Sequence, residues 1–215
     1  MNKQTILSKV FGWMFIGLLV TFLTGYVVSL NPNMLMNALS GIGFWLIIIA
    51  ELFLVIFLSA RITKMQPTTA KISFLLYSFV SGLTFSSIFI TYQLSSIMYV
   101  FLIAAVIFGI FALIGAYTKK DLSKLGTYLA MGLFGVILIT IFNLFIGSST
   151  TILILSIVSI LIFIGYTAYD VQKILRLYDN SILPEDNLAI YGALELYLDF
   201  INIFLDLLQL FGDSD

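Results

Sequence analysis

The sequence predicts an all-α membrane protein with seven transmembrane helices, and three features of the chain predict it. Hydrophobic residues make up 61% of the 215 residues and charged residues only 10%, with a mean hydropathy of +1.13. Soluble domains carry about 25% charged residues, so this chain is suited to lipid as its solvent. The apolar residues form long runs, unlike the alternating segments of about ten residues in a membrane β-barrel. The positive charges fall only at the N-terminus and beside alternate connections between those runs.

Seven runs are long enough to cross the hydrocarbon core, which takes a helix of about 20 apolar residues. They cover roughly residues 10–30, 39–60, 70–92, 96–117, 127–147, 151–175 and 187–211. The first run begins like a secretory signal, after Lys3 and Lys9, but it is too long for one and no small-residue cleavage site follows it. We therefore expect a retained first helix and one membrane domain, residues 1–215, with short connections.

The second to fifth runs have the composition of ordinary spans. The second is apolar apart from Glu51 near its middle. The third, fourth and fifth contain small residues, which let helices approach closely in lipid. We interpret these small residues as packing positions: Ser81, Gly82, Ser86 and Ser87; Gly109 and Gly115; Gly132 and Gly135.

The basic residues predict the orientation in the membrane. Connections one (NPNMLMNA), three (QLSS) and five (GSST) contain no Lys or Arg. All ten basic residues flank the N-terminus or connections two, four and six: Lys3, Lys9, Arg61, Lys64, Lys71, Lys119, Lys120, Lys124, Lys173 and Arg176. The positive-inside rule makes that face cytoplasmic. With seven spans, the N-terminus is then cytoplasmic and the C-terminus lies outside.

The composition also excludes several kinds of chemistry. With ten basic residues and a net charge of -1, the chain is not expected to bind nucleic acid. It has no Cys and no His, which removes disulfides, thiol catalysis and the usual zinc, copper and haem sites. We expect no cofactor, and proton chemistry falls to carboxylates, Tyr or Lys. Any bound metal would be a hard cation on oxygen ligands.

The seventh run carries a polar stripe along most of its length. Glu195, Asp199, Asn202, Asp206 and Gln209 occupy positions i, i+4, i+7, i+11 and i+14, which lie on one face of a helix. A carboxylate that faces acyl chains costs several kcal/mol. The stripe must therefore face protein or water. This predicts that helix seven is central and is wrapped by the other six.

Two further acids lie inside apolar runs. Glu51 is near the middle of helix two, and Asp170 is about five residues from the cytoplasmic end of helix six, at a depth close to that of Glu195. We expect Asp170 to approach Glu195 or Asp199, where two carboxyls in a low dielectric would share a proton. Arg61, at the cytoplasmic end of helix two, is an alternative partner for Asp170. An aspartate with two partners would be a pH-sensitive latch; the alternative is static hydrogen bonding to nearby tyrosines.

Four segments carry a resemblance to a known family. AYDVQKI (168–174) and LYLDFINIF (196–204) resemble the paired signatures of the Bax-inhibitor family of seven-span membrane proteins. TKKDLSKLG (118–126) and FVSGLTFSSIF (79–89) are similar to that family's helix-four exit and helix-three segments. The resemblance implies a central seventh helix, a pH-sensitive leak of cations, notably calcium, and restraint of cell death in eukaryotic members.

The resemblance also implies roles for particular residues. Asp170 and Asp199 would form an aspartate pair across helices six and seven, with Arg61 of helix two as the latch. The short loops resemble those of bacterial members. For these, inner-membrane residence and interaction with a membrane-anchored protease are implied.

These observations lead to one expected function and two alternatives. We expect a passive, pH-sensitive calcium (cation) leak channel with Asp170, Asp199 and Arg61 as pH sensor and gate. The expected ion pathway comprises Glu195, Asp199, Asn202, Asp206 and Glu51, with Asp199 and Glu195 as candidate calcium contacts. The first alternative is a non-conducting regulator that binds other membrane proteins, such as a membrane-anchored protease. The second, an intramembrane aspartyl protease using Asp170 and Asp199, lacks the glycine that usually adjoins the catalytic aspartate, so we do not expect an enzyme.

Overall fold

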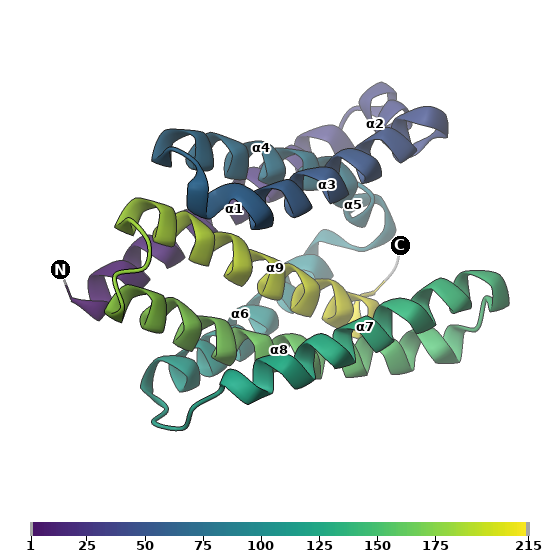
Figure 1. The fold of residues 1–215 in the computed structure, drawn as a ribbon. Coiled ribbons are helices and arrows are strands. Elements are labelled where there is room, and N and C mark those ends of the chain that lie inside the picture. The colour runs from purple at the N-terminus through teal and green to yellow at the C-terminus, as the bar shows by residue number, and fades with distance from the viewer. Residues whose placement is uncertain (1, 214–215) are drawn as a thin grey trace. The chain divides into compact units, whose positions relative to one another are not determined.

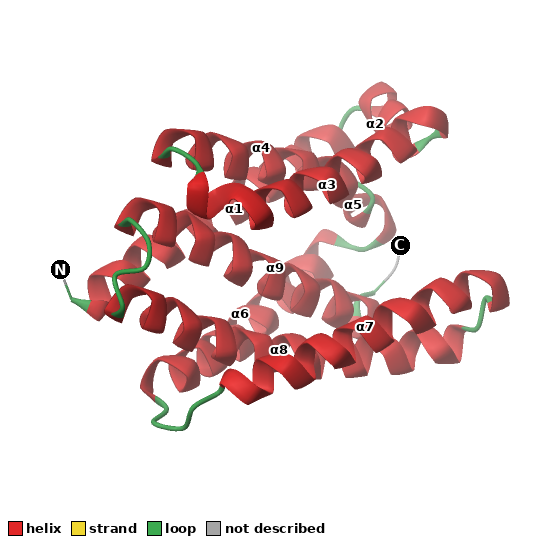
Figure 2. Cartoon of the chain, viewed as in Figure 1, coloured by secondary structure: helices red, strands yellow, loops and turns green. Residues whose placement is uncertain are grey.

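The computed structural model describes residues 2–213. The regular elements along this range are helices (Figures 1 and 2). They are α1 (Lys3–Ser29), α2 (Pro32–Leu39), α3 (Gly41–Arg61), the 3₁₀ helix η1 (Ile62–Lys64), α4 (Pro67–Phe85), α5 (Ile88–Thr91), α6 (Leu94–Tyr117), α7 (Ser123–Ile146), α8 (Ser149–Asp179) and α9 (Glu185–Phe211).

Seven stretches of the described residues are long and apolar enough to cross a membrane. They are Lys3–Ser29, Gly41–Lys64, Pro67–Thr91, Leu94–Tyr117, Ser123–Ile146, Ser149–Asp179 and Glu185–Phe211. The predicted all-α fold with seven transmembrane helices is confirmed. The last span, α9, is the most enclosed: 72% of its most apolar window is buried, against at most 44% in the other six. This agrees with the predicted central position of helix seven.

The first and sixth spans extend further than the apolar runs predicted. α1 begins at Lys3, not near residue 10, because the side chain of Asn2 caps the helix by accepting a hydrogen bond from the Thr5 backbone N–H at 3.1 Å. α8 runs from Ser149 to Asp179 instead of ending near residue 175. Both extensions are polar helical turns, which a count of apolar residues alone cannot detect.

The predicted run 70–92 is divided in the structure. α4 ends at Phe85 and the short α5 begins at Ile88. The backbone N–H groups of Ser86 and Ser87 bond to carbonyls three residues back, those of Leu83 and Thr84, and the two serine hydroxyls donate to the same carbonyls. Serine hydroxyls that compete for helix carbonyls interrupt regular α-helical bonding. These two serines therefore end α4, a role that the prediction of packing positions does not include.

The described residues form two compact units, each with its own core. Unit 1 contains α1 to α5 and residues 177–197, and unit 2 contains residues 94–176 and 198–213. α9 is one continuous helix whose first half belongs to unit 1 and whose second half belongs to unit 2. Because of this division, the prediction of a single membrane domain remains a prediction.

In unit 1, α4 packs against α1 and α3 (Figure 1). Tyr197 of α9 is fully buried and makes edge contacts with Phe74 and Tyr77 of α4. The Thr21 hydroxyl of α1 donates to the Ser78 carbonyl at 2.9 Å and lies 2.7 Å from the Tyr197 hydroxyl, which must therefore donate to it. Aromatic packing and a satisfied polar contact together fix the first half of α9 against α1 and α4.

Ion pairs fix the start of α9 in the same unit. Lys9 of α1 lies 3.5 Å from Glu185, and Lys71 of α4 lies 3.0 Å from Asp186. Two acids in the first turn of α9 also complement the positive end of the helix dipole. The buried Asn187 amide donates to the carbonyls of Ile62 and Met65, at 2.9 and 2.8 Å. The connection between α3 and α4 is thereby attached to α9.

In unit 2, α6 and α8 touch at a glycine. A Cβ added to Gly115 would lie 2.3 Å from the Ala168 carbonyl oxygen, so this glycine permits the close approach that the sequence predicted. Gly109 and Gly135 have open space beside them, so the prediction that they are packing positions is wrong. Phe200 of α9 packs edge-on against Phe101 and Phe108 of α6.

Candidate functional site

The two aspartates of the predicted pair are both buried in unit 2. Asp170 lies in α8 and is 3% exposed, and Asp199 lies in the second half of α9 and is 4% exposed. A positive charge reaches one of them: the Nζ atom of Lys173 lies 3.7 Å from Oδ1 of Asp170, one helical turn away. Each aspartate also takes part in further polar interactions.

The relative depth of the two aspartates follows from the register of α8 and α9. These helices run in opposite directions (Figure 1), and the hydroxyls of Ser159 and Ser156 on α8 lie beside the carboxylate of Asp206 on α9. Asp170 is eleven residues beyond Ser159, whereas Asp199 is seven residues before Asp206. Asp170 is therefore displaced from the level of Asp199 by four residues if Ser159 sets the level and by seven if Ser156 does, about 6 to 10 Å along the axis at about 1.5 Å per residue.

The tilt of the side chains does not remove this difference, because Ser159 and Asp206, which set the register, are tilted in the same two directions. We call the end of unit 2 with the turn between α7 and α8 the turn end, and the end with Lys173 and Arg176 the basic end. Cα–Cβ bonds tilt toward the N-terminus of a helix. Asp170, nearer the basic end, is tilted toward the turn end, and Asp199 is tilted toward the basic end. The two carboxylates therefore lie on neighbouring helices of unit 2, offset along the axis by one to two helical turns.

A groove of about 590 Å³ lies between α7, α8 and α9 at the turn end. Its polar lining consists of Thr140, Asn143, Ser156, Ser159, Asn202, Asp206 and Gln209, and its apolar walls include Val136, Leu144, Ile152, Leu155 and Leu205. The groove extends from Gly147 in the α7–α8 turn to Asn202, three residues from Asp199. Three members of the predicted helix-seven stripe thus line one polar groove that leads toward the buried aspartates.

The turn at the mouth of the groove is held by Asn143 and Gly147. Gly147 ends α7 in the left-handed conformation, with φ +68°, which glycine adopts without steric cost. The buried Asn143 side chain accepts from the Ser148 backbone N–H and donates to the Ser148 carbonyl, both at 3.2 Å. These bonds satisfy the backbone of the turn and fix the groove wall between α7 and α8.

The remaining predicted site residues lie in unit 1. Glu195 is half-buried in α9. Glu51, in the middle of α3, accepts hydrogen bonds from Ser81 and Thr84 of α4 at 2.8 and 3.1 Å. Arg61 is the exposed last residue of α3, and no described residue of unit 1 forms an ion pair with it. Its pairing with Asp170, which belongs to unit 2, stays a prediction.

Sequence reasoning missed several residues of the site. Lys173 was counted only as a cytoplasmic charge, although its i+3 spacing from Asp170 already allows an ion pair. Ser156 and Ser159 were also missed. Together with Thr167 and Asp170 they recur at helical spacing on α8, and all four are buried. This second polar stripe was the signal that the sequence offered. A polar face along the length of one membrane helix needs a polar face on a neighbouring helix to pack against.

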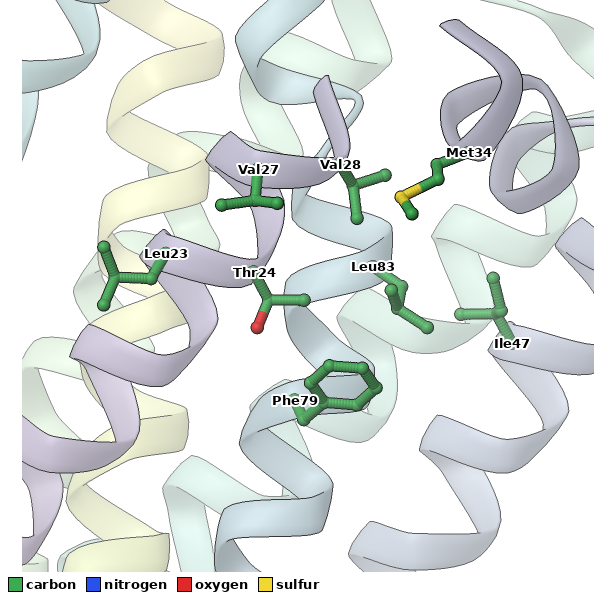
Figure 3. A pocket seen from close by; sticks show the side chains of 8 residues that line it. All are labelled: Leu23, Thr24, Val27, Val28, Met34, Ile47, Phe79 and Leu83. Atoms are coloured by element: carbon green, nitrogen blue, oxygen red, sulfur yellow. The ribbon is translucent and has the colours of Figure 1, made fainter. Parts of the chain in front are cut away.

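A second pocket has a different character. It measures about 660 Å³ and lies in unit 1 among α1, α2, α3 and α4 (Figure 3). Leu23, Val28, Met34, Ile47 and Phe79 line it, and Thr24 adds a hydroxyl. A lining without charge offers nothing to an ion, so the groove of unit 2 is the better candidate site.

Comparison with known proteins identifies the family. A sequence profile of the family described as "Inhibitor of apoptosis-promoting Bax1" matches residues 3–215. The chain belongs to the Bax inhibitor family. Inner membrane protein YbhL of Escherichia coli K12 is 41% identical to this chain. The match covers 98% of this chain and 92% of YbhL. A Bax inhibitor family chain with these seven spans is an integral membrane protein.

Other relatives match the same full length. A protein of Borreliella burgdorferi is 40% identical over 98% of this chain and 92% of its own. A protein of Deinococcus radiodurans is 34% identical over 99% of this chain and 92% of its own. The similarity thus extends over nearly the whole chain.

Proposed function

We propose that this Bax inhibitor family member is a pH-sensitive, passive leak for calcium and related cations, gated by the carboxylates of Asp170 and Asp199. One observation carries the proposal: Asp170 and Asp199 are both buried in unit 2, and a groove of the same unit, lined by oxygen-bearing side chains, reaches Asn202, three residues from Asp199. Hard cations bind carboxylate, amide and hydroxyl oxygens. Intramembrane acids typically mark ion or proton pathways, because their burial is otherwise costly.

The proposed pathway uses the predicted stripe of helix seven. Asp206 and Asn202 line the groove, and Asp199 with Glu195 would be the candidate calcium contacts further along α9. We also propose that Glu51, which lies in unit 1, belongs to the ion pathway. Among residues 2–213 no three acidic side chains gather into a metal-binding cluster. A pathway of single carboxylates with neutral oxygens would hold cations weakly, as passive conduction requires.

The proposed setting is a bacterial inner membrane, where the relative YbhL is named as residing. The basic residues would lie on the cytoplasmic side, so the turn end of unit 2 would face outside. The mechanism requires no cofactor and no enzymatic step, since the ion moves down its gradient. The proposed partners are therefore the lipid bilayer and calcium ions.

The proposed gate is the buried aspartate pair, with Arg61 as its alternative partner. If an Arg61–Asp170 ion pair closes the path, protonation of Asp170 breaks it and flux rises as the pH falls. If a proton-shared Asp170–Asp199 pair closes the path, loss of that proton opens it and flux rises with pH. We favour the first arrangement, because Arg61 is at the helix end where a gate would act.

Calcium flux into liposomes that contain only this protein tests the proposal. Asp199→Ala should reduce the flux at least tenfold, because it removes an oxygen ligand and a charge from the buried end of the pathway. Asp213→Ala is the matched control: this exposed acid lies just beyond the end of α9 and should be dispensable. No flux from the unmodified protein, or equal loss in both variants, would favour the alternative of a non-conducting regulator that binds other membrane proteins, such as a membrane-anchored protease.

A further inference from the structure

The groove at the turn end contains a carboxylate that lacks a counter-charge from the described chain. No Lys or Arg among residues 2–213 forms an ion pair with Asp206. The basic residues of unit 2 lie at its opposite end. Lys173, for example, is fourteen residues beyond Ser159 on α8, about 21 Å along the axis from the level of Asp206. The charge of Asp206 is therefore balanced either by a proton or by a cation from outside the protein.

Neutral oxygen atoms surround this carboxylate. The hydroxyls of Ser156 and Ser159 lie beside it, and the amides of Asn202 and Gln209 line the same groove on α9. Hydroxyl and amide oxygens, with one carboxylate, are the ligands of hard divalent cations. Ser156 and Ser159 are 4% and 7% exposed, so packing holds their positions before any ligand arrives.

We propose that this groove is a binding site for a partly hydrated divalent cation, centred on Asp206. The volume of about 590 Å³ is far larger than a bare ion, so the cation would keep part of its water. A single carboxylate predicts weak binding, with a dissociation constant on the order of 1 mM, as in other weak calcium sites. The onward passage of the cation rests on the proposed leak, whereas its binding at Asp206 does not.

Manganese, a paramagnetic divalent cation, can locate the site. The chain has no cysteine, so one introduced cysteine carries one nitroxide label. Leu144→Cys places the label on an exposed residue that lines the groove. Tyr128→Cys places the control label on an exposed residue sixteen positions earlier on α7, about 24 Å away along the axis. Both proteins are measured at full length in nanodiscs of uncharged lipid.

We expect manganese to broaden the Leu144→Cys spectrum saturably and to leave the Tyr128→Cys spectrum unchanged at the same concentrations. Asp206→Asn should remove the saturable broadening, and Ser159→Ala should weaken manganese binding about three- to tenfold. Asp213→Asn should leave the binding unchanged. Thermal unfolding of each variant confirms that it is folded. Broadening that is equal at both labels, or that survives Asp206→Asn in folded protein, overturns the site.

The site and the leak fail in different ways. Calcium flux without Asp206-dependent manganese broadening removes the site and leaves the leak. Broadening that depends on Asp206 in a protein that conducts no calcium supports the site and removes the leak. If both are real, Asp206→Asn should raise the half-saturating calcium concentration for flux about tenfold when calcium is supplied at the turn end.

Discussion

The Nζ atom of Lys173 lies 3.7 Å from Oδ1 of Asp170, one turn away on the same helix. The side chain of Lys173 is 32% exposed, whereas that of Asp170 is 4% exposed. A basic residue that reaches from the basic end of α8 thus supplies charge to a buried acid of the proposed gate. Both residues lie on α8, so their ion pair does not depend on which residue of another helix Asp170 contacts.

Lys173→Gln should move the midpoint of the pH response of flux to higher pH, by about half a unit to one unit. Removal of the ammonium makes protonation of Asp170 easier, and this sign holds for either direction of gating. Calcium flux in liposomes across a pH series measures the midpoint. Lys124→Gln, which removes an exposed charge at the same end of unit 2, should leave it unchanged.

Gly115→Ala and Gly109→Ala form a matched pair on α6. The new Cβ at position 115 would meet the backbone of Ala168 on α8, which cannot move without displacing the helix, so we expect a loss of about 2 kcal/mol or more. The new Cβ at position 109 meets nothing within 4 Å and should be neutral or slightly stabilising. Thermal unfolding in detergent compares them. Equal melting temperatures would mean that α6 and α8 are not in close contact.

Asn187→Ala should destabilise unit 1 by about 1–3 kcal/mol. The substitution leaves the Ile62 and Met65 carbonyls without the amide that now donates to both of them from a side chain only 1% exposed. The exposed Asn33→Ala is the control and should have no measurable effect. Thermal unfolding of the two variants provides the test, and similar melting temperatures would contradict the proposed attachment of the α3–α4 connection.

Much of the fold was predictable from the sequence, because apolar runs of span length report directly on the lipid environment. The break at Ser86 and Ser87 was not, since serine is compatible with a helix until its hydroxyl competes for a carbonyl. The stripe on α9 was visible, and it led to Asp199 and Asp206. The opposing stripe with Ser156 and Ser159 was missed, because isolated serines in an apolar run resemble packing residues until the register of two helices is known.

Asp121, in the connection between α6 and α7, should not contribute to the pH response. Hydrogen bonds from the Ser123 hydroxyl and backbone N–H, together with the Arg176 charge, hold the pKa of this carboxyl below its usual value of 3.8. A lowered pKa in the folded state stabilises the protein above the unfolded pKa, and this contribution is lost as the pH falls through the folded pKa. Asp121 is thus ionised throughout pH 5.5–8.5, a range well above ~4. Asp121→Asn should leave the pH profile of flux unchanged, whereas a shifted profile would show that the connection takes part in sensing.

The pH dependence of calcium flux into protein-only liposomes, compared between the native protein and Asp170→Asn, is the most direct measurement. Between about pH 5.5 and 8.5 the usual carboxyl is fully ionised, so a native response there requires carboxyls in an unusual environment. We predict that the native flux changes severalfold across this range and that Asp170→Asn flattens the profile, whichever contact closes the path. A folded Asp170→Asn variant that keeps the native pH dependence would contradict the proposed sensor and would direct attention to Glu51 and Glu195.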